Sequence, residues 1–248
     1  MSYNPFSLTN KSILVTGASS GIGRAVAIEC SKSGASIIAT GRNQERLEQT
    51  LGNLEQIGSH IAVQADLASI EEISRLVSEI PVLDGAVFCA GVNDKTLVKM
   101  IDQEKIEKMF QTNVFSQMLL IKELIKKKKL NAGASLVMIS SIASSYSTIS
   151  NSLYAASKGA IESFVRVLAL ELAPRKIRVN AIRPGMVETP ILESYALGEG
   201  LEEFKKQFPL GRFGRPEEIA YGIMYLLSDA SQWTTGSFLT IDGGITLR

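Results

Sequence analysis

The sequence is poor in residues that bind metal ions or form disulfides. It contains one histidine and two cysteines in 248 residues. His60 begins an apolar, strand-like run and has no second histidine to join it, so neither a histidine metal site nor a Ser-His triad is expected. Cys30 and Cys89 both lie within apolar segments, which argues against a disulfide framework. We therefore expect chemistry that uses no metal ion.

Long apolar runs and an excess charge of one sign are also absent. No run of 18 apolar residues occurs, so no membrane span is expected. Residues 1–10 lack the basic and apolar regions of a signal peptide. The net charge of +1 argues against a broad nucleic-acid surface. A content of 45% hydrophobic and 21% charged residues is ordinary for a globular protein with a large core. These features predict a cytoplasmic protein.

Short apolar runs alternate with amphipathic segments along the whole chain. This alternation predicts a parallel sheet with helices on both faces, and some strands are apolar on both sides, as buried parallel strands require. No repeat, linker or composition shift marks a boundary, so residues 1–248 are expected to form one doubly wound, Rossmann-type domain. Strands are expected at 12–16, 36–40, 60–64, 85–89, 135–140, 178–183 and 237–241. Helices are expected at 21–33, 43–57, 70–80, 102–128, 152–172 and 216–227.

A glycine-rich turn joins the first expected strand to the first helix. Residues 16–23 read Thr-Gly-Ala-Ser-Ser-Gly-Ile-Gly. Glycines let the backbone turn tightly and approach a ligand, while the start of a helix offers free N–H groups to an anion. A pyrophosphate is the natural occupant. The spacing Gly-x-x-x-Gly-x-Gly gives a slightly longer loop than the commoner Gly-x-Gly-x-x-Gly, and a plain strand-to-helix turn is the alternative.

The end of the second expected strand bears on the choice of dinucleotide. Gly41 stands where an acidic residue would contact the adenosine ribose of NAD, and Arg42 follows it. A guanidinium suits a 2′-phosphate, which a carboxylate would repel, so we predict NADP(H) in preference to NAD(H). The alternative is that Arg42 is solvated and caps the next helix. Asp66 could accept a hydrogen bond from the adenine amino group, or could cap the helix that follows it.

A tyrosine and a lysine share one face of the helix expected at 152–172. Tyr154 and Lys158 are four residues apart, and an ammonium near a phenol lowers the phenol pKa. Such a phenol can exchange a proton with a carbonyl or alcohol oxygen near neutral pH. Ser141 follows the apolar run 135–139, so its hydroxyl is expected at the carboxyl end of a strand. We hypothesise that these three residues are the reacting end of a hydride-transfer enzyme. The pair alone is weak evidence, since this spacing also arises by chance.

Three further segments carry open alternatives. Asn113 lies inside the helix expected at 102–128. Either it is a polar residue on the helix surface, or its amide disrupts the helical hydrogen-bond ladder and exposes a carbonyl to water. Residues 191–210 form a long segment of weak helical period, which is typical of a substrate lid. The lysine run 126–129 is expected to be a solvated helix end, with docking of an acidic carrier protein as a minority alternative.

Together, these motifs resemble the short-chain dehydrogenase/reductase family along nearly the whole chain. The final third, around 211–218 and 227–231, is most similar to the β-ketoacyl-acyl-carrier-protein reductase branch. That branch label is shared by reductases of many other substrates. The resemblance is carried by residues 16–23, Ala90-Gly91, Asn113, Ser141, the segment Tyr154-Ala-Ala-Ser-Lys158, Pro184-Gly185 and Asp242-Gly243-Gly244.

The resemblance implies a role for each matching position. Tyr154 would be the general acid/base, Lys158 would bond the nicotinamide ribose and tune the phenol, and Ser141 would hold the substrate oxygen. Asn113 would anchor a water that connects Lys158 to solvent. Family members commonly form tetramers through their long helices and the C-terminal strand. Besides Arg42, Tyr154 and Lys158, the expected cofactor contacts are Gly17, Ser19, Ser20, Gly21, Ile22, Gly23, Asp66, Leu67, Ala90, Gly91, Pro184, Gly185, Val187 and Thr189.

Two departures from the family pattern are visible. Phe88-Cys89-Ala90-Gly91 replaces the usual Asn-Asn-Ala-Gly, which removes amides that brace the central sheet. Ser20 stands where many NADP-preferring members have a basic residue, so Arg42 would recognise the phosphate largely alone.

The predicted activity is NADP(H)-dependent reduction of a small ketone, of 3-oxoacyl type or similar and possibly carrier-bound, to a secondary alcohol. A dehydrogenase of alcohols, polyols or sugars is the alternative, because residues 143–152 are rich in hydroxyl groups. A nucleotide-binding protein without turnover is a remote third, disfavoured by the intact set of four expected catalytic residues.

Overall fold

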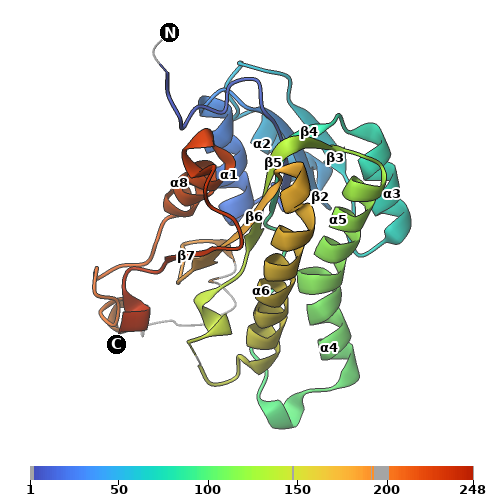
Figure 1. Ribbon diagram of the computed structural model, residues 1–248. Helices are drawn as coiled ribbons and strands as arrows, with labels where there is room; N and C mark the ends of the chain where they lie inside the picture. Colours follow the sequence, from blue (N-terminus) through green and yellow to red (C-terminus); the bar gives the residue numbers. More distant parts are fainter. Residues whose placement is uncertain (1–2, 147, 191, 193–200, 248) are drawn as a thin grey trace.

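Within the part of the chain that the structure describes, seven parallel strands form one sheet (Figure 1). The computed structural model describes residues 3–146, 148–190, 192 and 201–247. The strand order is β3-β2-β1-β4-β5-β6-β7, so the direction of winding reverses between β1 and β4. The strands are β1 Ser12–Thr16, β2 Ser36–Gly41, β3 Ile61–Gln64, β4 Leu83–Phe88, β5 Leu130–Ile139, β6 Arg178–Pro184 and β7 Phe238–Ile241.

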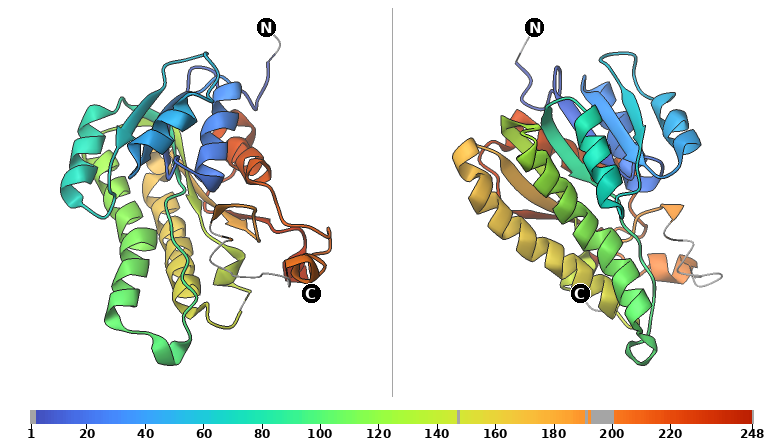
Figure 2. Two further views of the ribbon diagram at one scale, coloured as in Figure 1. Left: turned by 180° about the vertical axis from the view of Figure 1, so that it is seen from behind. Right: turned by 90° about the vertical axis from the view of Figure 1, so that its right-hand side faces the viewer.

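Helices cover both faces of this sheet, as the alternating sequence pattern predicts (Figure 2). Alternate residues of a strand point to opposite faces, so Leu14 packs with α3, α5 and α6, while Ile13 and Val15 pack with α1, α2 and α8. The expected Rossmann-type architecture is therefore confirmed. The helices are α1 Gly21–Lys32, α2 Gln44–Leu51, α3 Ile70–Glu79, α4 Gln103–Phe110, α5 Ser116–Lys126, α6 Ser152–Leu172, α7 Leu201–Lys205 and α8 Pro216–Leu227.

Two of the expected helices differ from the observed ones. The helix expected at 43–57 ends at Leu51, where Gly52 follows and the Asn53 side chain donates to the carbonyl of Gln49. The helix expected at 102–128 is interrupted by a π-helical turn, η2, at Gln111–Phe115. None of the helices in the described ranges is long and apolar enough to span a membrane.

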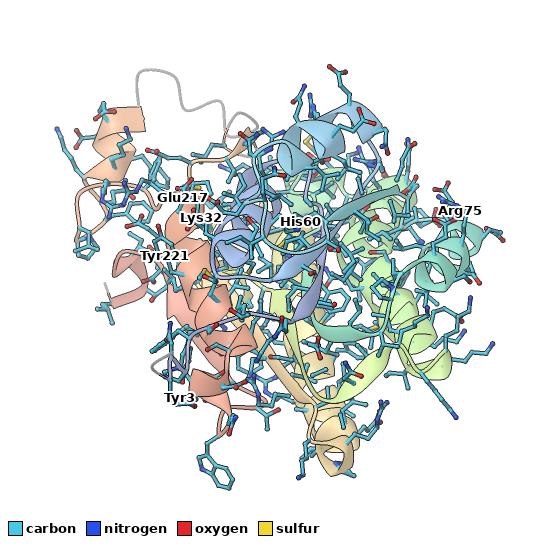
Figure 3. All side chains as sticks on the ribbon, turned by 90° about the horizontal axis from the view of Figure 1, so that it is seen from above. Tyr3, Lys32, His60, Arg75, Glu217 and Tyr221 are labelled. Atoms are coloured by element: carbon cyan, nitrogen blue, oxygen red, sulfur yellow. The ribbon has the colours of Figure 1, made fainter. Side chains whose placement is uncertain are left out.

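The single histidine has a structural place beside β2 (Figure 3). The Nδ1 atom of His60 accepts a hydrogen bond from the Ile37 N–H at 3.1 Å, and its Nε2 lies 2.8 Å from the carbonyl oxygen of Glu55. The imidazole therefore satisfies backbone groups at the start of a strand. This position explains the residue without a catalytic role.

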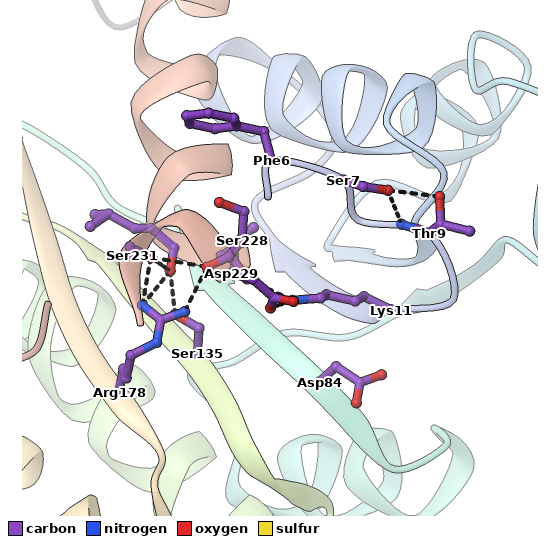
Figure 4. Close-up of polar contacts among 12 residues, drawn as sticks. Phe6, Ser7, Thr9, Lys11, Asp84, Ser135, Arg178, Ser228, Asp229 and Ser231 are labelled. Carbon is purple, nitrogen blue, oxygen red and sulfur yellow. Dashed lines mark hydrogen bonds and ion pairs between the residues drawn. The ribbon is translucent and has the colours of Figure 1, made fainter. Parts of the chain in front are cut away.

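Buried polar side chains anchor the end of α8 to the sheet (Figure 4). Arg178 donates to the carbonyl of Leu226 and to the Ser231 hydroxyl, both at 2.8 Å, and Ser135 donates to the same carbonyl at 2.7 Å. The last carbonyls of a helix have no partner within it, so β5 and β6 supply the donors here. As a result, α8 is fixed against the strands whose opposite ends border the site.

Candidate active site

A cavity of about 550 Å³ opens at the carboxyl ends of β1, β4, β5 and β6, next to the point where the winding reverses. This is the edge at which doubly wound sheets bind ligands. Every predicted site residue except Asn113 lines the cavity. The structure therefore brings together, around one cavity, two segments that are far apart in the chain: the glycine turn at 17–23 and the loop at 184–189.

The glycine turn has a shape that side chains would prevent. Gly17 and Gly21 have φ values of +64° and +52°, in the region that favours glycine. A Cβ on Gly23 would overlap the carbonyl oxygen of Gly17, and one on Gly17 would lie 3.0 Å from the Ala90 nitrogen. The turn thus packs closely on itself and on the end of β4, and it leads into the first turn of α1 at the cavity. Backbone N–H groups at such a helix start suit a pyrophosphate.

Arg42 lines the cavity directly after the end of β2 and is exposed. It forms no ion pair with any residue of the described ranges. The alternative that it caps the next helix is wrong, because Asn43 caps α2 by accepting from the Arg46 N–H at 2.8 Å. The guanidinium is therefore placed to meet an anion at the end of β2.

Asp66 also lines the cavity, but it does not cap α3. Ser69 occupies the cap position and accepts from the Glu72 N–H at 3.2 Å. One oxygen of Asp66 instead accepts from the Ala68 N–H at 3.0 Å. The carboxylate is thereby oriented by its own turn, and its predicted contact with an adenine amino group stays a prediction.

Lys158 lies beneath Tyr154 on the cavity wall, one turn further along α6. Its Nζ donates to the carbonyl of Ile139 at 2.7 Å and lies 5.5 Å from the centre of the Tyr154 ring. The side chain is 3% exposed, and burial lowers the pKa of Lys158 to about 8, although the neighbouring Cys89 acts in the opposite direction. The amine is thus poised to change protonation close to neutral pH, beside the phenol that the sequence singled out.

Ser141 follows β5 and begins the short helix η3, Ile142–Ser144. Its Oγ accepts a hydrogen bond from the Ala143 N–H at 3.1 Å. Because the oxygen acts as an acceptor there, its own hydrogen remains available to a substrate oxygen in the cavity. The serine, the phenol and the glycine turn therefore border one space, as the hydride-transfer hypothesis requires.

Asn113 is fully buried within the π-helical turn, so the alternative of surface polarity is wrong. Its Oδ1 accepts from the Val92 N–H at 2.8 Å, and its Nδ2 donates to the Val92 carbonyl at 2.9 Å. The helical ladder is disrupted, as predicted, and the Asn113 carbonyl accepts from the Gln117 side chain at 2.9 Å. Asn113 thus holds the Gly91–Val92 wall of the cavity, and the water-anchoring role stays a prediction.

The substrate side of the cavity is mainly apolar and is lined by residues of the two segments considered above, 143–152 and 191–210, together with Met186 and Ile245, which no sequence signal indicated. Phe204, Phe208 and Phe213 pack edge to face around Ile245, and the first two line the cavity. Tyr146, Thr148 and Asn151 supply polar groups on another part of the lining. Of the lid expected at 191–210, residues 191 and 193–200 lie outside the described ranges, and the rest includes α7 and the aromatic cluster. The three phenylalanines at 204, 208 and 213 were the sequence signal that could have indicated an apolar cluster beside the cavity.

The lysine run 126–129 lies at the opposite end of the sheet from the cavity (Figure 1). Lys127 donates to the carbonyl and hydroxyl of Ser74, each at 2.9 Å, and Lys129 donates to the carbonyl of Ile80. Two of the four lysines therefore bind the end of α3 instead of forming a wholly solvated helix end. A carrier docked there would be far from the reacting residues.

Comparison with known proteins gives consistent results over the whole chain. A family model described as enoyl-(acyl carrier protein) reductase matches residues 17–246. The 3-oxoacyl-(acyl-carrier-protein) reductase FabG of Rickettsia felis is 34% identical over 97% of this chain and 98% of its own. Glucose and ribitol dehydrogenase homolog 2 of Arabidopsis thaliana is 35% identical over 97% of this chain and 87% of its own.

Solved structures show the same arrangement. A putative NAD(P)-dependent gluconate 5-dehydrogenase from Beutenbergia cavernae, with NADP bound at low occupancy, has a TM-score of 0.89 and 29% identity, covering 99% of this chain and 100% of its own. A glucose/ribitol dehydrogenase from Brucella melitensis has a TM-score of 0.91 and 31% identity, covering 98% and 99%. The fold and the cavity define a dinucleotide-dependent oxidoreductase. The chain belongs to the short-chain dehydrogenase/reductase family.

Proposed function

We propose that this protein uses NADP(H) to reduce a ketone of 3-oxoacyl type to a secondary alcohol. The observation that carries the proposal is that Ser141, Tyr154 and Lys158 line the same cavity as the glycine turn. The apolar substrate side, with Phe204 and Phe208, suits a substrate with an apolar body. The similarity to the Rickettsia reductase supports the same substrate class.

The residues of the site divide the reaction between them. When bound, the nicotinamide supplies the hydride that adds to the carbonyl carbon. Tyr154 donates its phenolic proton to the carbonyl oxygen as negative charge develops there, and the Ser141 hydroxyl orients that oxygen. Lys158, held by the Ile139 carbonyl, favours the phenolate that remains and would bond the ribose of a bound nicotinamide. Reversal of the same steps oxidises an alcohol.

The preference for NADP(H) follows from charge at the end of β2. Arg42 is exposed at the cavity, and Gly41 occupies the position of the ribose-binding carboxylate. The related structure with NADP bound supports this assignment. Gly17, Ser19, Ser20, Gly21, Ile22, Gly23, Leu67, Ala90, Gly91, Pro184, Gly185, Val187 and Thr189 would form the remainder of the cofactor wall.

A polyol or sugar dehydrogenase is the second candidate. It is favoured by the polar part of the lining, Tyr146, Thr148 and Asn151, and by similarity to proteins named as glucose, ribitol and gluconate dehydrogenases. The test is a rate comparison between 3-oxoacyl thioesters, simple ketones, enoyl thioesters, sugar alcohols and sugar acids, each with NADP(H) and NAD(H). Highest kcat/KM for a 3-oxoacyl thioester with NADPH is the expected result. Highest kcat/KM for a sugar alcohol or an enoyl thioester contradicts it, and cofactor binding without turnover supports the non-catalytic alternative.

We further propose a cytoplasmic homotetramer. Val167 and Leu170 on α6 and Leu239 on the edge strand β7 are exposed, as is Trp233 near that edge. These exposed apolar side chains are available for contact between copies, and the resemblance to the family supports assembly through the same elements. The free thiols of Cys30 and Cys89 suit a reducing compartment. Light scattering at micromolar concentration tests the assembly, and a monomer mass contradicts it.

A further inference from the structure

A buried carboxylate continues the stripe of site residues along α6. Glu162 is four residues beyond Lys158 and eight beyond Tyr154, so the three share one helix face. Its side chain faces the sheet, and the residue is 5% exposed. Glu162 does not line the cavity. A buried charge behind a catalytic wall requires close polar partners, and these show what it holds in place.

The partners of Glu162 come from both sides of Ser141. Its Oε1 accepts from the Ser140 hydroxyl at 2.8 Å and from the Ser144 hydroxyl at 2.6 Å. Arg183 on β6 donates from Nε to Oε1 at 2.7 Å and from Nη2 to Oε2 at 2.5 Å. This two-point geometry fixes the carboxylate plane as well as its position. One carboxylate thus joins α6, β6 and the two residues that bracket the substrate-holding serine.

A second tie lies one helical turn away. Lys158 donates to the carbonyl of Ile139, and the Ser140 N–H donates to the carbonyl of Ile182 at 2.8 Å. The segment from Ile139 to Ser144 is therefore attached to α6 at two heights, with Ser141 between the two attachments. A displacement of either attachment changes the distance between the Ser141 hydroxyl and the Tyr154 phenol.

The charge on Glu162 is maintained by its neighbours. Burial raises the pKa of Glu162, but hydrogen bonds from Arg183, Ser144 and Ser140 together hold that pKa below its ordinary value. Arg183 is itself stacked on Phe238 of β7, with its guanidinium carbon 4.8 Å from the ring centre, and Arg166 lies 4.6 Å from the same ring. The ion pair is therefore enclosed by side chains and ionised at neutral pH.

We propose that Glu162 is a positioning residue that sets the Ser141 hydroxyl relative to Tyr154 through Ser140, Ser144 and Arg183. The inference rests on the proposed function, because it assumes that Ser141 holds the substrate oxygen. Glu162 itself contacts neither substrate nor cofactor in this assignment. Its effect on the reaction passes through the serine, and this dependence makes it testable.

The test measures the effect of Glu162→Gln in two backgrounds, the wild-type enzyme and the Ser141→Ala variant. Glutamine keeps the volume but turns an amide N–H₂ toward Arg183. We expect kcat to fall about 10- to 100-fold, as for small displacements of reacting groups, while the Kd for NADPH changes less than about twofold. In a Ser141→Ala background the same substitution is expected to lower kcat by less than about twofold, because the serine through which it acts is gone.

Two further variants keep the test decisive. Arg166→Gln is the matched control, because Arg166 lies 4.0 Å from the same carboxylate on its solvent side and forms no hydrogen bond or ion pair with the described residues 139–144. Its kcat is expected to match wild type. Ser144→Ala removes one of the tethers without touching the ion pair, so it answers the question if Glu162→Gln folds poorly. It is expected to lower kcat while leaving the Kd for NADPH unchanged.

The outcomes separate this inference from the proposed function. Equal kcat for Glu162→Gln and Arg166→Gln, or the same fold-loss with and without Ser141, overturns the positioning role. Full activity of Ser141→Ala alone overturns the role of the serine in the proposed function. A large rise in the NADPH Kd for both Glu162→Gln and Ser144→Ala shows a general structural role and also contradicts the inference.

Discussion

The amine of Lys158 and the carbonyl of Ile139 form a 2.7 Å hydrogen bond that ties the middle of α6 to the last residue of β5. The bond holds a buried amine at the base of the cavity, directly below the ring of Tyr154. Lysine has three donors, so two remain for the cavity side. Since the amine is buried with one protein acceptor, its protonation is coupled to both stability and catalysis.

The first prediction concerns the pH dependence of stability without cofactor. The pKa of Lys158 falls from 10.5 to about 8 on folding, so between these values the unfolded chain binds more protons. The free energy of unfolding therefore rises with pH across this window, by on the order of 3 kcal/mol for this group. Lys158→Met removes that contribution. Urea unfolding from about pH 7.5 to about pH 10 should give a steeper rise for wild type than for the variant.

Other groups titrate in the same pH window. Their contributions cancel when the free energy of unfolding of Lys158→Met is subtracted from that of wild type at each pH. We expect Lys158→Met to be the more stable protein at the lower pH, with the gap closing as pH rises. Parallel curves for the two proteins would show that the amine is not desolvated in the folded chain.

A second prediction concerns the phenol. Tyr154→Phe removes the proton donor and keeps the ring, so kcat should fall by about 10²- to 10⁴-fold while NADPH binding is nearly unchanged. Steady-state consumption of NADPH and fluorescence titration measure the two quantities. Tyr225→Phe, on α8 and away from the cavity, is the control and should behave as wild type. Undiminished turnover of Tyr154→Phe would refute the assignment.

A third prediction separates the two dinucleotides. Arg42→Ala removes the cation expected to meet the 2′-phosphate, and hydrogen bonds to charged groups contribute about 1.5–3 kcal/mol. The Kd for NADPH should therefore rise by about 10- to 150-fold, with little change for NADH. The effect should weaken at high salt, because Arg42 is exposed. Calorimetric titration with both dinucleotides measures the ratio, and tighter binding of NADH by the wild-type protein would contradict the preference.

The fourth prediction compares two glycines. A methyl group on Gly23 meets the carbonyl oxygen of Gly17, whereas one on Gly159 of α6 has no atom within 4 Å. Gly23→Ala should lose NADPH binding and about 1–3 kcal/mol of stability through overpacking. Gly159→Ala should gain about 0.5–1 kcal/mol from helix propensity. Urea unfolding compares both with wild type, and a stable, NADPH-binding Gly23→Ala protein would show that the turn is not so tightly closed.

Local sequence signals predicted most of the fold. The bounds of β1, α6 and α8 agree with expectation because each has a clear signal: an apolar run before a glycine turn, a polar residue before a helix, and Pro216 in a first helical turn. The end of α2 was not predicted correctly because the amphipathic pattern continues past Gly52, whereas the helix itself ends at Leu51. The π-helical turn includes Asn113, whose side chain bonds Val92, 21 residues away, and no local pattern reveals this contact.

The site shows the same difference between features with a local sequence signal and features that depend on contacts between distant residues. Tyr154, Lys158 and the glycine turn have short-range spacings that a single sequence displays. Glu162 continues the spacing of Tyr154 and Lys158 by one more turn, and this signal was available. Its partner Arg183, however, is 21 residues away on strand β6, so only the packing of α6 on β6 brings the two together.

The ring of Phe238, on the edge strand β7, contacts the guanidinium groups of both Arg166 and Arg183. The Arg183 guanidinium donates to Glu162, which in turn accepts from Ser140. One aromatic ring on the edge strand is therefore connected to the loop that contains Ser141. A residue on an edge strand thus contacts the arginine that holds Glu162 in place. Under the positioning role proposed for Glu162, substitution of Phe238 is expected to alter turnover although Phe238 does not line the cavity.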